Sequence, residues 1–320
     1  MCEVTIIIPN YKGKEHLFPC VKSLYEQDRT EKKILIIDNA SEDGSIEQVK
    51  ELYPEIECVM LDKNYGFCRA VNIGIEKSDT PYVILLNNDT VIRKNYVRYL
   101  LETIKAEPNT FSIEPKMIQY HDSSRIDSAG TYYNALGWAF AYGKDKKVEN
   151  YQHARKIFAA CAGAAIYRRE VFEKIGMFDE KHFAYLEDTD IGYRARLLGY
   201  ENWYEPSAKV YHVGSGTSGS RYNLFKIRYS SRNNIYLIYK NMPLLQLILN
   251  LPFLLAGFLM KQLFFMKKGF GATYAKGIRA GICLSASKEG RAHKVPFAGR
   301  NFLHYCNLQL QLWVNLFRRV

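Results

Sequence analysis

Paired cysteines and glycine-rich phosphate loops are both missing from this sequence of 320 residues. The seven cysteines are scattered and include no Cys-x-x-Cys pair, which argues against a disulfide framework and against a zinc ribbon. No Gly-x-Gly-x-x-Gly follows the first apolar run, and no Gly-x-x-x-x-Gly-Lys-Ser/Thr occurs anywhere. The common dinucleotide-binding and P-loop classes therefore lose their main support.

Acidic residues are scarce at one end of the chain. Residues 221–320 contain 16 Lys and Arg but a single acid, Glu289, so their net charge is +15, whereas residues 1–220 carry −4. Between Lys240 and Lys261 lie twenty uncharged, mostly apolar residues. Basic and apolar residues together are typical of segments that contact an anionic membrane surface. They do not form the mixture of basic and exposed aromatic residues that a nucleic-acid binder needs, so we expect no nucleic-acid partner.

The apolar run is long enough to cross a bilayer but contains residues that disfavour a straight span. Asn241, Gln246 and Asn250 interrupt it with amides, and Pro243 and Pro252 lack the N–H group that a helix interior uses. We therefore expect an interfacial or re-entrant pair of helices over residues 241–266.

A second amphipathic helix is expected at the end of the chain. Its apolar positions recur at helical spacing, at Leu303, Cys306, Leu310, Trp313, Val314 and Phe317. We expect a cytoplasmic protein held peripherally or monotopically at the inner face of the cell membrane. The alternative is that both segments are core helices of an ordinary domain or the contact face of a homodimer.

The first hundred residues alternate between strand-like and helix-like segments. Short apolar runs are expected to form buried parallel strands at residues 4–9, 33–38, 56–61 and 82–87. Helices are expected between them at residues 14–25, 45–52 and 67–77. This order predicts a doubly wound α/β sheet, whose ligand crevice lies at the carboxyl ends of the strands.

Polar clusters follow each of these strands, where such a crevice would lie. They are Pro9-Asn10-Tyr11, Asp38-Asn39, Asn64-Tyr65-Gly66 and Asn87-Asn88-Asp89. One cluster alone would be read as a turn, but four at successive strand ends indicate a site. Asp89 is a candidate ligand for Mg²⁺ or Mn²⁺, because these cations prefer oxygen donors and take phosphate oxygens as further ligands.

A second polar group comes a hundred residues later, at the expected start of a helix. Glu187, Asp188 and Asp190 are more acids than helix capping requires. A carboxylate among negative neighbours has a raised pKa and can accept a proton, as a general base does. His212, after a strand-like segment, is either a metal ligand or an ordinary half-buried histidine.

The order of these motifs resembles the family 2 glycosyltransferases, in particular their rhamnosyltransferase-like branch. The motifs are IIIPNY, IIDNASEDGS, NYGFCRAVNIGI, LLNNDT, AGAAIYRREVFEKIGMFDE and YLEDTDIGYRARLLGY, followed by a histidine. The resemblance covers about 215 residues. It implies a GT-A fold with a mixed sheet, a nucleotide-sugar donor and an inverting transfer to a hydroxyl group.

The same resemblance implies roles for individual residues. The nucleotide sugar would be bound by Pro9, Asn10, Tyr11, Asp38, Asn64, Gly66, Phe67, Asn72, Asn87, Asn88 and Arg232. The metal would be held by Asp89 and His212, and Asp188 of the Glu187-Asp188 pair would be the catalytic base. Asn87 stands where many relatives carry the first acid of an Asp-x-Asp motif, so this chain offers one carboxylate fewer at that position.

The domain and function hypotheses follow from the charge pattern and the resemblance together. We expect a catalytic domain over residues 1–220, with a nucleotide-sugar-binding half (1–110) and an acceptor and base half (111–220), followed by a helical membrane-associating region (221–320). The donor would be dTDP-rhamnose or a UDP-sugar, and the acceptor a glycan or lipid-linked glycan of bacterial cell-surface polysaccharide. The alternatives are a catalytically impaired membrane-bound scaffold and a sugar nucleotidyltransferase.

Overall fold

Four apolar runs near the start of the chain form the parallel half of a large sheet. The computed structural model describes residues 2–214 and 222–318. The parallel strands are β1 (Val4–Asn10), β2 (Lys33–Asp38), β3 (Glu57–Met60) and β4 (Tyr82–Leu85), in the order β3-β2-β1-β4. Their connections contain α1 (Leu17–Glu26), α2 (Ser45–Leu52) and α3 (Phe67–Lys77). These elements confirm the alternation expected from the sequence.

The rest of the sheet makes it mixed. Strand β11 (Ile166–Arg168) pairs antiparallel with both β4 and β6 (Thr110–Gln119), and β12 (Glu201–His212) runs parallel to β6. Shorter strands add to its edges: β5 (Thr90–Ile92), β7 (Ile126–Ser128) and β10 (Arg155–Ile157). A separate hairpin consists of β8 (Thr131–Tyr133) and β9 (Ala139–Ala141). The doubly wound mixed sheet of the GT-A type is therefore confirmed.

Alternate side chains of the central strands enter two hydrophobic cores, one on each face of the sheet. Ile7 packs in the core that includes Val71 and Ile75 of α3, whereas Ile6 and Ile8 face the opposite core. That opposite core also takes residues from α1 and from α4 (Tyr96–Ala106). Covering both faces leaves the carboxyl ends of the strands as the place for a site.

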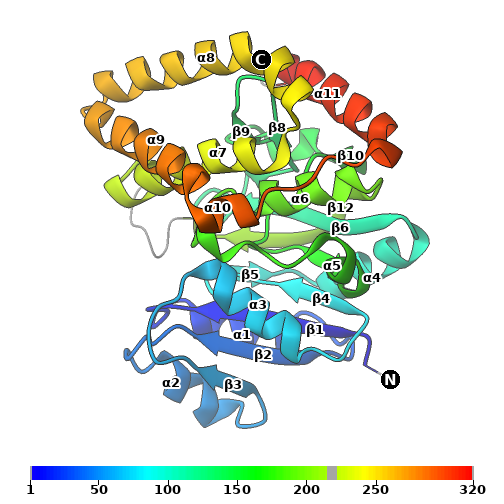
Figure 1. Ribbon diagram of the computed structural model, residues 1–320. Helices are drawn as coiled ribbons and strands as arrows, with labels where there is room; N and C mark the ends of the chain where they lie inside the picture. Colours follow the sequence, from blue (N-terminus) through cyan, green and yellow to red (C-terminus); the bar gives the residue numbers. More distant parts are fainter. Residues whose placement is uncertain (1, 215–221, 319–320) are drawn as a thin grey trace.

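The remaining helices come from the second half of the chain. Helices α5 (Arg169–Ile175) and α6 (Glu187–Leu197) accompany the mixed half of the sheet, with short 3₁₀ turns at Val148–Asn150 and Glu180–His182. A layer of helices lies beyond them at the top of Figure 1. It comprises α7 (Leu224–Asn241), α8 (Leu244–Lys267), α9 (Gly271–Ala286), α10 (Lys288–Ala292), a 3₁₀ turn (Gly299–Asn301) and α11 (Phe302–Phe317). The expected domain boundary at residue 220 falls in 215–221, outside the described residues, and the domain division stays a prediction.

Residues 241–266 do not form the expected pair of helices. Helix α8 is continuous for 24 residues, with Pro252 inside it. Proline removes only the N–H that would bond the carbonyl of Ile248, and Ile248 lies on the exposed side of the helix. In the described part of the chain, α8 is the one helix long and apolar enough to span a membrane by length and composition, and 22% of its apolar window is buried in the protein.

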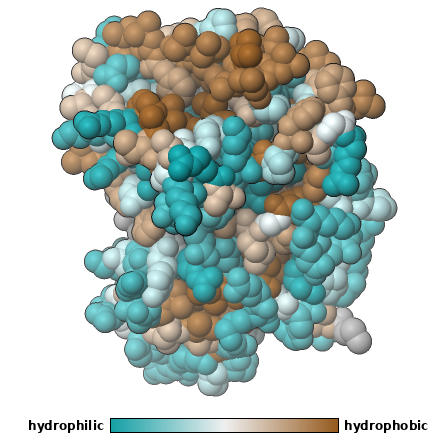
Figure 2. All heavy atoms as spheres, in the orientation of Figure 1, coloured by the Kyte–Doolittle hydropathy of each residue, from teal (hydrophilic) through white to brown (hydrophobic). Residues whose placement is uncertain are grey.

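Helices α8 and α11 bury amide side chains together with leucines, and expose many apolar side chains. The amides of Asn250 and Gln309 are buried and donate to each other at 2.8–2.9 Å. We define the apolar helical face by exposed side chains of these helices, Leu244, Leu245, Ile248, Leu249, Leu251, Leu255, Leu259, Leu263, Leu303, Leu310, Val314 and Phe317. Figure 2 shows apolar residues gathered over this end of the molecule. The amphipathic helix expected near residue 303 is confirmed.

Candidate active site

A cleft of about 1530 Å³ opens where the carboxyl ends of the strands meet the start of α6. It brings together residues that lie far apart in the sequence. Those that the sequence singled out and that line the cleft are Pro9, Asn10, Tyr11, Asn64, Gly66, Phe67, Asn87, Asn88, Asp89, Glu187, Asp188 and His212. Asp38, Asn72 and Arg232 lie outside this lining.

Asn10 organises the end of the cleft formed by β1 and β2. Its amide nitrogen donates to Asp38 at 2.7 Å, and its amide oxygen accepts a hydrogen bond from Asn88 at 2.8 Å. Asp38 is fully buried and also accepts from the backbone N–H of Ser41 at 2.9 Å. The Asp38 carboxylate therefore stabilises the strand-end turn, while its neighbour Asn39 lines the cleft.

The turn before α3 forms the next wall. The side chain of Asn64 accepts from the backbone N–H of Gly66 at 2.8 Å. Gly66 has φ +86°, and a Cβ there would lie 2.5 Å from the ring of Phe183, so the turn requires glycine for both conformation and space. Asn72 is buried one turn further on and exchanges hydrogen bonds with the backbone of Phe178 at 2.8 and 3.1 Å. Asn72 thus joins α3 to the segment that leads to Glu187.

Asp89 and His212 lie close together where the start of β5 pairs with the end of β12. His212 Nε2 lies 3.4 Å from Asp89 Oδ1, and its Nδ1 lies 2.8 Å from Asp127 Oδ2. Lys144 in turn forms an ion pair with Asp127. Burial opposes the charged form of both groups, but the neighbouring carboxylates raise the pKa of His212 to about 10 and the imidazole lowers that of Asp127 to about 2.

The donor set at Asp89 and His212 fits one divalent cation that shares its coordination with phosphate. One carboxylate oxygen and one ring nitrogen converge, and the other ring nitrogen is bonded to Asp127. A cation would have to displace the proton that the raised pKa of His212 keeps on Nε2. Within residues 2–214 and 222–318, no group of three or more His, Cys, Asp or Glu side chains is arranged to hold a metal. Phosphate oxygens and water would therefore have to complete the coordination shell.

Glu187 and Asp188 begin α6 and also line the cleft. Asp188 accepts from the backbone N–H of Thr189 at 2.6 Å, and the buried carboxyl oxygen Oε2 of Glu187 has no hydrogen-bond partner among residues 2–214 and 222–318. Although both residues retain some exposed area, burial raises the pKa of Asp188, and burial with the nearby Asp188 charge raises that of Glu187 to about 8. The pair can therefore share a proton near neutral pH.

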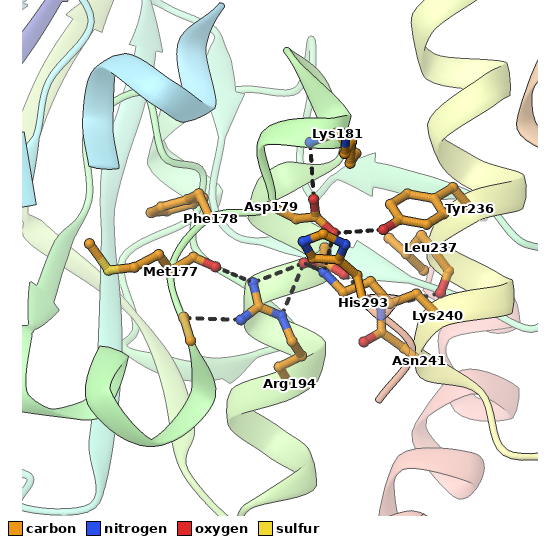
Figure 3. A network of polar contacts seen from close by, with 12 residues as sticks. Met177, Phe178, Asp179, Lys181, Arg194, Tyr236, Leu237, Lys240, Asn241 and His293 are labelled. Atoms are coloured by element: carbon orange, nitrogen blue, oxygen red, sulfur yellow. Dashed lines mark hydrogen bonds and ion pairs between the residues drawn. The ribbon is translucent and has the colours of Figure 1, made fainter. Parts of the chain in front are cut away.

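Helix α7 is hydrogen-bonded to the segment that precedes Glu187 and Asp188. Arg232 donates to the backbone carbonyls of Lys181 and His182, the latter at 3.1 Å. Its guanidinium is therefore directed to the loop that carries the acids, and the predicted contact with the donor diphosphate remains a prediction. Deeper still, Figure 3 shows Asp179, Arg194, Tyr236, Lys240 and Asn241 in one polar network.

The sequence assigned no role in the site to Asp127, Lys144 or Asn39, all of which line the cleft. Asp127 lies 85 positions before His212 in a three-residue strand, and nothing local links the two. Asn39 follows Asp38 in a cluster that the sequence did single out, so the signal was present but assigned to the neighbouring residue. The register of β6, β7 and β12 is what brings Asp127 to His212.

Two solved structures share this fold, and the name of one of them includes a nucleotide. The chain superposes on "GalNAc-T7 with UDP, GalNAc and Mn2+" with a TM-score of 0.60 at 16% identity, over 75% of this chain and 48% of that one. It superposes on S. aureus TarS 1-349 with a TM-score of 0.51 at 14% identity, over 99% of this chain and 85% of the other. At these identities the likeness establishes the fold alone.

Curated proteins with similar sequences are glycosyltransferases. An N-acetylglucosaminyl-diphospho-decaprenol L-rhamnosyltransferase of Mycobacterium tuberculosis is 26% identical over 240 residues, 67% of this chain and 77% of the relative. The hexosyltransferase Agl10 of low-salt glycan biosynthesis in Haloferax volcanii is 27% identical over 202 residues, 61% and 62% of the two chains. The family profile described as glycosyl transferase family 2 matches residues 5–176, more than half of the chain. From the cleft, the fold and this match together, the chain belongs to glycosyltransferase family 2.

Proposed function

We propose that this protein is an inverting glycosyltransferase that moves a sugar from dTDP-rhamnose or a UDP-sugar to a hydroxyl of a glycan or lipid-linked glycan. The proposal rests on one cleft that is lined both by Asp188 and by the Asp89–His212 pair. Inversion requires a base and a site for the departing diphosphate to face each other across the sugar. An acceptor hydroxyl and a donor would both fit in a cleft of about 1530 Å³.

The donor would lie along the strand ends. Pro9, Tyr11 and Asn39 line the part of the cleft above β1 and β2, where the nucleoside would bind. Asn87 and Asn88 lie between that part and Asp89, so their amides can donate to ribose or phosphate oxygens. Asp38 and Asn72 would act through the turns that they hold, because their own side chains are bonded within the protein.

In the proposed step Asp188 takes the proton of the acceptor hydroxyl as its oxygen attacks the anomeric carbon. A new carbon–oxygen bond forms on the face opposite the breaking bond, and the nucleoside diphosphate leaves with the electron pair. Glu187, with a pKa of about 8, carries a proton at neutral pH and so adds little negative charge beside the base. A Mg²⁺ or Mn²⁺ ion held by Asp89 and His212 would offset charge on the leaving diphosphate.

The membrane is the proposed place of action, at the cytoplasmic face. The outward-directed leucines of the apolar helical face would enter the lipid boundary, and the +15 charge of residues 221–320 would attract anionic headgroups. The M. tuberculosis relative is named for a polyprenyl-linked acceptor, which supports a lipid-linked acceptor here. Its named sugar likewise favours rhamnose as the first donor to test.

Calorimetric titration tests the donor assignment. The full-length protein is titrated with UDP, dTDP, GDP, UDP-glucose and dTDP-rhamnose, each with and without Mn²⁺. We expect binding of one pyrimidine diphosphate class that Mn²⁺ strengthens by about tenfold or more. A folded sample that binds none of them would contradict the proposal and favour a scaffold that has lost its donor site.

A further inference from the structure

The loop that carries the acids adopts an unusual backbone conformation. Phe183, Tyr185 and Leu186 all have positive φ, at 63°, 74° and 66°, although none is glycine. Each such residue costs about 1 kcal/mol or more and persists where its surroundings hold it. The loop ends directly at Glu187 and Asp188, so whatever holds it also places the proposed base.

Asn233 of α7 is the group on which this loop converges. Its amide nitrogen lies 2.9 Å from the carbonyl oxygen of His182 and 2.8 Å from those of Ala184 and Tyr185. An amide has two N–H donors, so at least one of them is shared between carbonyls. Asn233 is fully buried, and within the described residues these loop carbonyls are its side-chain nitrogen's partners.

The same face of α7 also holds both ends of the loop. Lys240, two turns after Asn233, donates to Asp179 at 2.7 Å and to Asp190 at 2.9 Å. Asp179 precedes the loop and Asp190 follows Asp188 by two residues. Tyr236, between them on that face, donates to Asp179 at 2.9 Å, as Figure 3 shows. Positions 233, 236 and 240 fall on one stripe of a helix.

The other side of α7 packs closely against α9. A Cβ on Gly277 of α9 would lie 1.8 Å from Ser231 Oγ, and one on Gly281 would lie 2.5 Å from the carbonyl oxygen of Arg232. These glycines let α9 approach the backbone of α7. The helix is thus clamped between α9 and the loop, and it has little freedom to shift without moving the loop.

We propose that Asn233 is a positioning residue for the reaction, which sets the place of Asp188 by holding the carbonyls of residues 182, 184 and 185. This rests on the proposed role of Asp188 as the base. Because a base displaced by about 1 Å loses on the order of 100-fold in rate, the hydrogen bonds of one buried amide can control turnover. The helical region is, on this view, a part of the catalytic machinery as well as a contact for the membrane.

The test compares Asn233→Ala with Asn234→Ala in the full-length protein. Asn234 is a matched control, because it is the next residue on α7, is equally buried, and bonds Tyr133 and Gly137 at 2.8–2.9 Å instead of the loop. Donor-binding sites are counted by titration with UDP and dTDP in Mn²⁺. Turnover is measured as release of nucleoside diphosphate from UDP-glucose or dTDP-rhamnose with N-acetylglucosaminyl-diphospho-polyprenol, and is expressed per donor-binding site.

We expect Asn233→Ala to lower kcat about 100-fold per donor site while the donor Kd changes by less than about threefold. Asn234→Ala should keep kcat within about threefold of the wild type. A purely structural role for Asn233 would reduce the number of donor sites and leave kcat per site unchanged, and that result would overturn the inference. Equal losses of kcat per site in both variants would overturn it too.

Two further variants test the inference if Asn233→Ala fails to bind donor or if Asp188 is not the base. If Asn233→Ala binds no donor, Asn233→Ser, which retains one donor hydroxyl, is measured instead and should lose about tenfold or more in kcat per site. Asp188→Asn distinguishes the proposed role of Asp188 as the base from the positioning role of Asn233. If Asp188→Asn remains active, the proposed base is wrong, whereas an inactive Asp188→Asn beside a fully active Asn233→Ala contradicts the positioning role alone.

Discussion

Single side chains of the cleft are bonded to residues far away in the sequence, and this sets what each can do. Asp127 is the clearest case, because one of its oxygens lies 2.8 Å from His212 Nδ1 while His212 Nε2 faces Asp89. A carboxylate on the far nitrogen of a metal-binding histidine fixes the orientation of the ring. Asp127 therefore belongs to the proposed metal site although it would not touch the ion.

Removing this carboxylate should weaken metal binding. We expect Asp127→Asn to reduce the affinity for Mn²⁺ in the presence of UDP by about 10- to 100-fold, measured by calorimetric titration. Asp122→Asn is the control, since Asp122 is half-exposed in a nearby loop and pairs with Arg125 at 3.0 Å. Equal Mn²⁺ affinities for the wild type and Asp127→Asn would rule out this orienting role.

At the scale of elements, α6 and α7 are joined by a buried charge network. Lys240 lies between Asp179 and Asp190, and Arg194 contacts Asp190 at 2.9 Å. Burial disfavours a charged carboxylate, yet Lys240 and Arg194 hold the pKa of Asp190 well below its ordinary range. A lowered pKa adds stability above the ordinary carboxylate range, and this stability is lost as the pH falls through the lowered value.

Breaking this network should destabilise the fold strongly. We expect Lys240→Met to lower the free energy of unfolding by about 3–5 kcal/mol near pH 7, because it leaves the buried Asp179 without a cation and the buried Asp190 with Arg194 alone. Chemical denaturation measures the change. Lys33→Met is the control: it removes an ion pair with Asp79 in which both side chains are more than half exposed, and should cost less than about 1 kcal/mol. Similar losses in both variants would contradict the account.

The local pattern of the sequence predicts elements better than it predicts contacts between them. The helices at 45–52 and 67–77 have the expected bounds, because N-terminal acids, amphipathic spacing and flanking turns are local signals. The first helix begins at Leu17 and not at residue 14. Helix α8 continues past Pro252, because the carbonyl that proline leaves unbonded lies on the exposed side.

The site was predictable in part for the same reason. Residues at strand ends converge by topology, so Asn10, Asn88 and Asp89 could be expected in one cleft, whereas Asp188 was expected there from the family resemblance. Asn233 and Asp127 could not, since their partners depend on how α7 packs on the loop and on the pairing of β6 with β7 and β12. Asp38 accepts hydrogen bonds from the backbone and side chain of Ser41, and its predicted contact with the nucleotide stays a prediction.

At the scale of the whole molecule, polarity is divided between the two ends. Figure 1 shows α8 and α11 at the end opposite α2. The apolar helical face lies at the end formed by α8 and α11. These two helices bury the amides of Asn250 and Gln309 between them. A surface helix in water seldom exposes so many leucines while it buries amides. This is the arrangement expected of helices whose outer face meets lipid.

Charges placed on that face should release the protein from membranes. We expect the double variant Leu255→Glu, Leu259→Glu to bind vesicles containing phosphatidylglycerol at least about tenfold more weakly, because both leucines are about 60% exposed and would lose their apolar burial. Sedimentation with vesicles measures binding. Leu52→Glu, 62% exposed on α2 at the other end, should bind as the wild type does. Undiminished binding by the double variant would exclude α8 as the contact.

The turnover of Asp188→Asn, measured together with its donor affinity, tests whether Asp188 is the catalytic base. Asparagine keeps the size of the side chain but cannot take the acceptor's proton, so we expect kcat to fall by about 100-fold or more. The donor Kd, measured by titration with the nucleotide sugar that the wild type binds, should stay within about threefold, because the proposed mechanism assigns Asp188 to the acceptor hydroxyl. An Asp188→Asn enzyme that turns over at a large fraction of the wild-type rate would contradict the central claim.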